Sequence, residues 1–150
     1  MAYIKTLEEK CEALLKLVLG IQGYYKTTSS ENKRLIETTI GAAIWYLPKS
    51  KKFLFTGKIS KEAKEKKEKS EDHLYPRKIA AMEILNLNWS EEVNPLKTIL
   101  NLFLKKYGRY NYVSKTENKK LIPFQKSGVF ISPEIAYKKA GIELEEFRKD

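Results

Sequence analysis

Residues 110–121 read YNYVSKTENKKL, and this stretch decides the fold class. Its first half places tyrosines at alternate positions among β-forming residues, so it predicts a short strand over Tyr110–Ser114. Its second half predicts a short helix that begins at Thr116 and ends before Pro123. A strand that leads directly into a helix, in a chain whose other segments are mostly helical by pattern, indicates a helix-rich α+β fold with a small β element embedded among the helices.

Hydrophobic periodicity and capping signals predict helices on both sides of this stretch. The predicted helices cover residues 7–25, 31–47, 59–69, 78–87, 95–107 and 132–141. Thr6-Leu7-Glu8-Glu9 is typical of a capping box at the start of the first helix, and the third carries Lys61–Glu65 and Lys64–Glu68 at spacing four. We expect a single domain over residues 1–150, made of an N-terminal helical scaffold (1–50), a β-containing core with a helical insertion (51–125) and a C-terminal helix (126–150).

Composition and charge limit the class of protein. The 150 residues have a formal net charge of +10, and residues 96–130 hold eight basic side chains against one acid, Glu117. Such a surplus favours a polyanionic partner, nucleic acid ahead of an anionic membrane. The single cysteine, Cys11, excludes an internal disulfide framework and a cysteine-based zinc site.

The N-terminal residues and the apolar runs indicate the compartment. The longest apolar runs are too short to span a membrane, and acidic residues interrupt the layout that a signal peptide would need. The richness in Lys, Asn and Ile is typical of an AT-rich microbial or viral genome. We therefore expect a soluble protein of the cytoplasm, in a microbe or a phage-infected host cell.

The chain has one histidine, His73, which follows Asp72 in the segment EDHLYPR, residues 71–77. Pro76 disfavours helical geometry in the residue before it, so the segment is predicted to be extended. Adjacent side chains of an extended segment point to opposite sides, so Asp72 and His73 would approach a shared substrate from different directions. An aspartate oxygen is a ligand suited to Mg²⁺ or Mn²⁺, and a histidine with a pKa of about 6.5 can accept a proton from water.

Asp72-His73 with Pro76 three residues on, the strand Tyr110–Ser114 and Asn118 on the helix that follows together resemble the HNH, or ββα-metal (His-Me finger), endonuclease family, in its phage and restriction types. The resemblance covers about residues 57–121, and residues 51–125 would form a ββα-metal nuclease core. It implies a metal-dependent endonuclease that cuts DNA to leave 5′-phosphate and 3′-hydroxyl ends. His73 would be the general base, and Asp72 and Asn118 the ligands of Mg²⁺ or Mn²⁺.

The chain departs from the family pattern in three respects. A second histidine on the helix is missing, and Gln125 is the candidate for its place. The cysteine pairs that often brace the family's finger are absent. The separation between His73 and Asn118 is longer than usual, which implies a pair of helices inserted between the two strands.

Basic side chains near this constellation would bind the phosphates on either side of the scissile bond. These side chains are Arg77, Lys78, Arg109, Lys115, Lys119 and Lys120. The expected substrate is double-stranded DNA, and cutting both strands would need two sites and therefore a homodimer. A basic nucleic-acid-binding module without catalysis remains the alternative, since it keeps every charge argument and loses only Asp72, His73 and Asn118. A peripheral membrane protein is disfavoured because no segment pairs a strongly basic helical face with a bulky apolar one.

Overall fold

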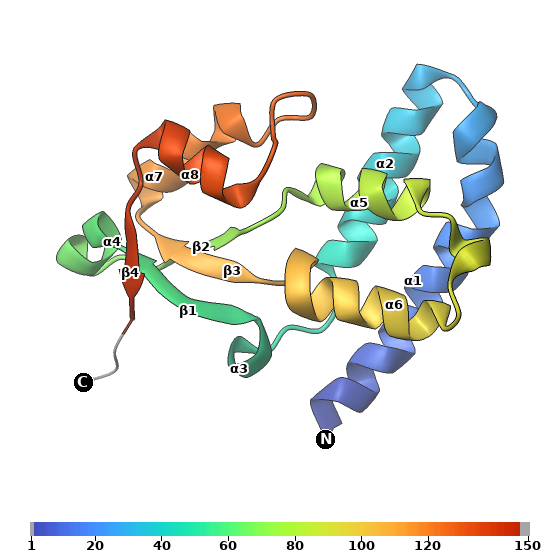
Figure 1. Cartoon of the computed structure of the whole chain (residues 1–150), viewed down its shortest axis with the longest axis horizontal. Helices are drawn as coiled ribbons and strands as arrows, with labels where there is room; N and C mark the ends of the chain where they lie inside the picture. The colour runs from blue at the N-terminus through green and yellow to red at the C-terminus, as the bar shows by residue number, and fades with distance from the viewer. Residues whose placement is uncertain (1, 148–150) are drawn as a thin grey trace.

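The computed structural model describes residues 2–147 and consists of a helical layer beside one end of a four-stranded sheet (Figure 1). Its elements are α1 (Ala2–Thr27), α2 (Ser30–Trp45), α3 (Lys51–Leu54), β1 (Phe55–Ser60), α4 (Lys61–Lys66), β2 (Ser70–His73), α5 (Arg77–Asn86), η1 (Trp89–Glu91), α6 (Pro95–Leu102), η2 (Phe103–Tyr107), β3 (Tyr110–Val113), α7 (Lys115–Leu121), η3 (Ile122–Phe124), α8 (Pro133–Ala140) and β4 (Leu144–Glu146). The predicted helix-rich α+β class is confirmed. No helix in residues 2–147 is long and apolar enough to cross a membrane.

The sheet has the strand order β2-β3-β1-β4, so β2 and β4 are its edges. β2 and β3 are antiparallel, with Asp72 opposite Asn111 and His73 opposite Tyr110. β1 runs parallel to β3, and β4 runs antiparallel to β1. Because α7 follows β3 directly, β2, β3 and α7 form the strand–strand–helix unit that the sequence predicts.

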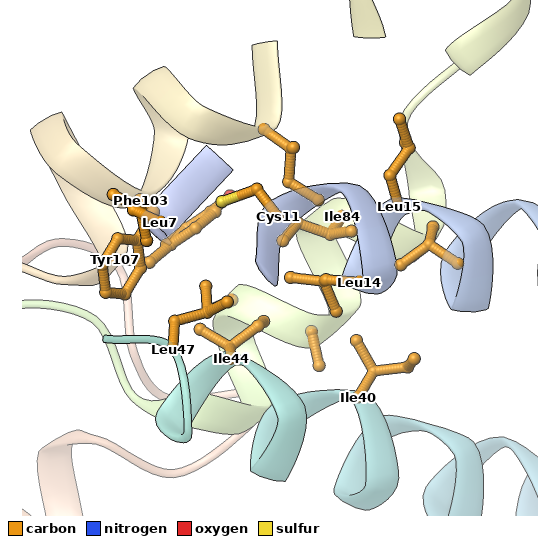
Figure 2. Close-up of a cluster of buried hydrophobic side chains, with 14 of the residues drawn as sticks. Leu7, Cys11, Leu14, Leu15, Ile40, Ile44, Leu47, Ile84, Phe103 and Tyr107 are labelled. Atoms are coloured by element: carbon orange, nitrogen blue, oxygen red, sulfur yellow. The ribbon is translucent and has the colours of Figure 1, made fainter. Parts of the chain in front are cut away.

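The helices α1, α2, α5 and α6 pack against one another to form the helical layer. α5 and α6 belong to the segment inserted between β2 and β3, so the insertion completes the scaffold that the N-terminal helices begin. Figure 2 shows Cys11 and Leu14 of α1 facing Ile44 of α2 and Ile84 of α5, all of them buried. Burial, with a smaller effect of nearby Glu8, raises the pKa of the Cys11 thiol to about 11, which makes it an unreactive core residue.

The first helix begins earlier than its capping-box pattern predicts. α1 starts at Ala2, and Thr6 lies inside it with its hydroxyl donating to the Ala2 carbonyl oxygen over 3.0 Å. The predicted start at residue 7 is wrong because Tyr3 extends the packed stripe of the helix. The Tyr3 ring stacks on Phe53 at 5.1 Å, and its hydroxyl donates to the Pro48 carbonyl oxygen over 2.8 Å.

The C-terminal segment contains a strand that the sequence did not predict. Of residues 126–150, where a C-terminal helix was expected, Pro133–Ala140 is helical and Leu144–Glu146 pairs with β1. Gly141 at φ 71° ends α8, a left-handed conformation that glycine adopts readily.

The position of β4 also changes the ion pairs of α4. Lys61 and Lys64 were expected to pair with glutamates four residues on. Instead Lys61 pairs with Glu143 at 2.6 Å and Lys64 with Glu145 at 2.9 Å. These pairs link α4 to the last strand, because β4 lies along β1 and brings its acids to the start of α4.

Gly108→Ala is expected to destabilise the fold. A Cβ at this position would lie 2.9 Å from the Leu54 Cδ2, the Phe103 Cζ and the Phe103 carbonyl oxygen, so the backbone would have to move at a cost of about 1–3 kcal/mol. Gly20→Ala is the matched control, because Gly20 is an exposed position of α1 with no atom near the added methyl. This substitution should stabilise the protein by about 0.5–1 kcal/mol. Urea unfolding would measure both changes, and a Gly108→Ala protein as stable as the parent would contradict the packing described.

Candidate active site

A cavity of about 310 Å³ gathers the three residues that the sequence predicts for catalysis. Asp72, His73 and Asn118 all line it, together with Gln125 and the basic residues Lys49 and Arg77. Asp72 and His73 belong to β2, and Asn118 belongs to α7. Because β2 is an edge strand, side chains from both of its faces can reach the same cavity.

Asp72 is a buried carboxylate held by neutral donors. It is 4% exposed, Gln125 Nε2 donates to its Oδ1 over 2.9 Å, and the Tyr137 hydroxyl donates to its Oδ2 over 2.5 Å. Burial raises the pKa of Asp72 and outweighs the two hydrogen bonds, which lower it. No lysine or arginine of residues 2–147 forms an ion pair with this carboxylate, so a cation in the cavity would be stabilised by it.

His73 is half-buried against aromatic rings. Its ring centroid lies 4.8 Å from that of Trp45 and 5.7 Å from that of Tyr110. Burial, with smaller effects of the positive charges of Lys49 and Arg77, lowers its pKa to about 4. The imidazole is therefore neutral at physiological pH and has a nitrogen lone pair that can accept a proton.

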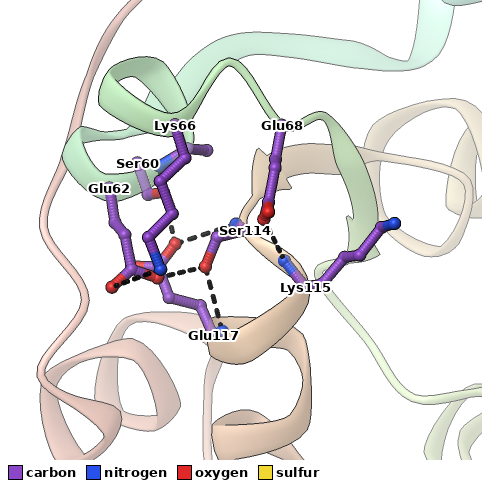
Figure 3. A network of polar contacts seen from close by, with 8 residues as sticks. Ser60, Glu62, Lys66, Glu68, Ser114, Lys115 and Glu117 are labelled. Carbon is purple, nitrogen blue, oxygen red and sulfur yellow. Dashed lines mark hydrogen bonds and ion pairs between the residues drawn. The ribbon is translucent and has the colours of Figure 1, made fainter.

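Asn118 is positioned by a hydrogen-bonded capping box at the start of α7 (Figure 3). The Glu117 amide donates to the Ser114 hydroxyl oxygen over 3.1 Å, and the Ser114 amide donates to Glu117 Oε1 over 2.9 Å. The Ser60 hydroxyl donates to the same carboxylate, and the Ser114 hydroxyl donates to Glu62. α7 consequently begins at Lys115 rather than at the predicted Thr116, because Ser114 caps it.

Glu117→Ala is expected to destabilise the protein by about 1–3 kcal/mol, because the Ser60 hydroxyl and the Ser114 amide lose their buried acceptor. Glu117 is 6% exposed, so water cannot readily replace the carboxylate. Thr116→Ala, one residue earlier on the same helix, serves as the control because Thr116 is exposed and should melt like the parent. Thermal unfolding followed by circular dichroism measures both, and equal melting temperatures would contradict this role of Glu117.

The donor atoms around Asp72 suit a hard divalent cation that keeps much of its water. Among residues 2–147, no three His, Cys, Asp or Glu side chains group to hold a metal ion. The cavity is also lined by Asn118 and by Gln125, which contacts Asp72, and their amide oxygens are ligands that Mg²⁺ accepts. The Gln125 side chain directs its amide nitrogen at Asp72. Rotation of the amide by a half-turn would direct its oxygen toward a cation held by Asp72. Glu71 also lines the cavity, so two carboxylates and two amides supply oxygen donors that fit Mg²⁺ or Mn²⁺.

Of the six basic residues that the sequence predicts to bind DNA, the structure brings Arg77 to this cavity. Its guanidinium carbon lies 4.6 Å from the Trp45 ring centroid. Lys78, next to it, pairs with Glu37 at 3.8 Å and does not line the cavity. Arg109 lines a second cavity of about 310 Å³ with Lys58 and Lys105, and its buried Nε has no hydrogen-bond partner within residues 2–147.

The remaining three predicted basic residues lie on α7. Lys115, Lys119 and Lys120 are exposed and do not line the cavity that holds Asp72 and His73. The Lys115 amide donates to Glu68 over 2.9 Å, as Figure 3 shows. Lys120 lines a different cavity, beside acidic residues that include Glu62 and Glu117. The structure therefore does not bring these lysines together with the predicted catalytic residues at one cavity.

Sequence reasoning missed three residues around the cavity. Trp45 and Lys49 line it, and Tyr137 binds Asp72 from α8, 65 residues further along the chain. Trp45 looks like a core residue of a predicted helix, and Lys49 looks like an exposed lysine after Pro48. No local pattern marks Tyr137, because its contact with Asp72 depends on how α8 packs against the sheet.

Comparison with known proteins finds no relative of this chain. No protein-family model matches the chain, and no curated protein or solved structure is significantly similar to it. The functional argument therefore depends on the geometry of the site and on the sequence motif.

Proposed function

We propose that the protein is a metal-dependent endonuclease of the HNH type that hydrolyses phosphodiester bonds in DNA and leaves 5′-phosphate and 3′-hydroxyl ends. The observation that carries the proposal is that Asp72 and His73 of β2 line one cavity with Asn118 of α7, the helix that follows the antiparallel partner strand β3. This supports the family resemblance, because residues that are distant in sequence meet in the arrangement that the resemblance implies.

His73 is the proposed general base. Its neutral ring can accept the proton of an attacking water, and its contact with the tilted Trp45 ring restricts how it can turn. A phosphate anion bound near Lys49 and Arg77 would offset the two positive charges that disfavour the protonated ring. Substrate binding would therefore raise the basicity of His73 at the step where a proton must be taken up.

Asp72 would hold the divalent cation, with the amide oxygens of Asn118 and Gln125 as the further protein ligands. When bound, Mg²⁺ or Mn²⁺ neutralises charge that develops on the phosphate and the leaving oxygen. Tyr137 orients the Asp72 carboxylate by donating to its Oδ2. The buried position of Asp72 makes its interaction with a cation stronger than that of a solvated carboxylate.

Purified protein is expected to nick or linearise supercoiled plasmid DNA in Mg²⁺ or Mn²⁺ and to lose this activity in EDTA. His73→Ala should lower the rate by roughly 100-fold or more, because general-base catalysis contributes about that much. Asn118→Ala should also lower the rate, whereas Asn86→Ala, at the exposed end of α5, should cleave like the parent.

Cleavage that persists at the parent rate in His73→Ala would remove this residue from the mechanism. The ratio of nicked to linear product reports whether one or two sites act on a duplex, and linear product formed directly would support a homodimer. Metal-independent cleavage would contradict the proposed role of Asp72.

Asp72→Asn is expected to abolish the stabilisation of the protein by Mg²⁺. A ligand that binds only the folded state raises the melting temperature as its concentration rises above its Kd, and the amide lacks the charge that attracts the cation. Without metal, the variant should melt at or above the parent temperature, because it removes a buried charge with a raised pKa. Thermal unfolding in MgCl₂, with NaCl of equal ionic strength as the control, measures this, and an equal Mg²⁺ shift in both proteins would exclude Asp72 as a ligand.

A second candidate function is nucleic-acid binding without catalysis. It is favoured by the observation that both oxygens of Asp72 already accept hydrogen bonds, from Gln125 and Tyr137. In this case Asp72 would be a structural residue that ties β2 to α8. The plasmid experiment separates the two, because this candidate predicts salt-sensitive DNA binding with no cleavage in any metal.

A further inference from the structure

Aromatic rings run side by side along one face of the sheet and continue into the candidate active site. This aromatic strip consists of Trp45, His73, Tyr110, Phe55, Tyr112 and Phe147, and neighbouring ring centroids along it lie 4.6–6.3 Å apart. On β3, Asn111 and Val113 alternate with the two tyrosines, and Val113 packs on the opposite side with residues of α7 and α8. The strip therefore occupies the face of the sheet away from α7 and α8.

Four basic side chains stand over the rings of the aromatic strip. At the end near the candidate active site, Lys49 Nζ lies 3.9 Å and Arg77 Cζ 4.6 Å from the Trp45 ring centroid. At the other end, Lys51 Nζ lies 5.5 Å and Lys69 Nζ 4.8 Å from the nearest ring centroid. All four side chains belong to exposed residues.

The charges of these four residues are not neutralised by protein acids. None of Lys49, Lys51, Lys69 and Arg77 forms an ion pair within residues 2–147, in contrast to the lysines of α4. Glu71 of β2 shares the face of His73, lies opposite Tyr112 and lines the cavity with Lys49 and Arg77, but it forms no ion pair within residues 2–147. A ring attracts a cation without cancelling its charge, so the strip holds these cations in place and leaves them attractive to an anion.

The burial of the rings decides which part of a nucleic acid they can recognise. Tyr110 and Tyr112 are 5% and 8% exposed, so no base can stack on either ring. The other rings of the strip are at most half-exposed, whereas the four cations are exposed, so the ammonium and guanidinium groups are the groups most accessible to a ligand. Such groups bind phosphate oxygens, and they do so without regard to base sequence.

We propose that the aromatic strip and its four cations are the track along which the sugar–phosphate backbone of one nucleic-acid strand reaches the cavity of Asp72 and His73. Lys49 and Arg77 bind phosphates beside the cavity, and Lys51 and Lys69 bind phosphates further along the strand. This inference rests on the proposal that the protein acts on nucleic acid, and it adds the surface that the strand occupies. All four residues lie outside residues 96–130, where the charge count of the sequence is most basic.

The salt dependence of DNA binding tests the track. Binding of a fluorescein-labelled DNA duplex is followed by anisotropy in EDTA over a series of NaCl concentrations. In the triple variant Lys49→Ala, Lys51→Ala, Lys69→Ala, the slope of log K against log[NaCl] should become shallower by roughly 2–3, since each phosphate contact contributes about 0.9. The matched control is the triple variant Lys10→Ala, Lys16→Ala, Lys26→Ala, which removes the same charge from exposed positions of α1 and should keep the parent slope.

An unchanged slope in the strip variant, or an equal loss in both triple variants, overturns the track. Circular dichroism establishes that the variants are folded, and Lys→Gln at the same three positions replaces the alanine variant if that variant is unfolded. The outcome is separate from that of the plasmid experiment. Cleavage by a protein whose DNA binding does not depend on the strip would support the nuclease proposal and contradict the track. Strip-dependent DNA binding without cleavage would support the track and contradict the nuclease proposal.

Discussion

The antiparallel pairing of β2 with β3 is the constraint on which the rest of the site depends. It places Asp72 opposite Asn111 and His73 opposite Tyr110, although residues 74–109 lie between the strands. Closing so long a segment costs conformational entropy, which the segment offsets by folding as α5 and α6 against α1 and α2. The helical layer therefore holds the two strands in register, and α7 then carries Asn118 to them because it follows β3 directly.

Alternation along β2 gives Asp72 and His73 opposite environments. Asp72 points to the side of α8 and is a buried carboxylate with a raised pKa, hydrogen-bonded only to neutral donors. His73 points to the side of Tyr110 and has a lowered pKa in a position flanked by Lys49 and Arg77. A cavity bordered by both therefore combines a carboxylate that favours a cation with a neutral base beside positive charges that favour an anion. Metal-assisted phosphodiester hydrolysis needs these two preferences side by side.

Sequence reasoning succeeded where the signal was local. Ser29, Ser60, Asn94 and Ser132 cap helices, as Ser and Asn side chains commonly do. Asp72, His73 and Asn118, which the order of strand and helix signals selected, line one cavity. It failed where a feature depended on residues distant in sequence. β4 forms only because β1 offers it an edge, and Tyr3 extends α1 only because Phe53 lies beside it. Tyr137 and Trp45 enter the site for the same reason, since the packing of α8 and the end of α2 decides what they contact.

The distribution of charge, like these contacts, depends on residues that are distant in sequence. Residues 96–130 are the most basic stretch of the sequence, yet within it Lys106 pairs with Glu83 at 2.9 Å and Lys120 borders a cavity with Glu62 and Glu117. A count along the chain cannot register such neighbours, because they come from elsewhere in the fold. Lys49 and Lys69, which no such count distinguishes, lie over aromatic rings and form no ion pair within residues 2–147. The attraction of a polyanion to this protein therefore depends on which cations the fold leaves without an acid, and several of these lie on the sheet face that leads to His73.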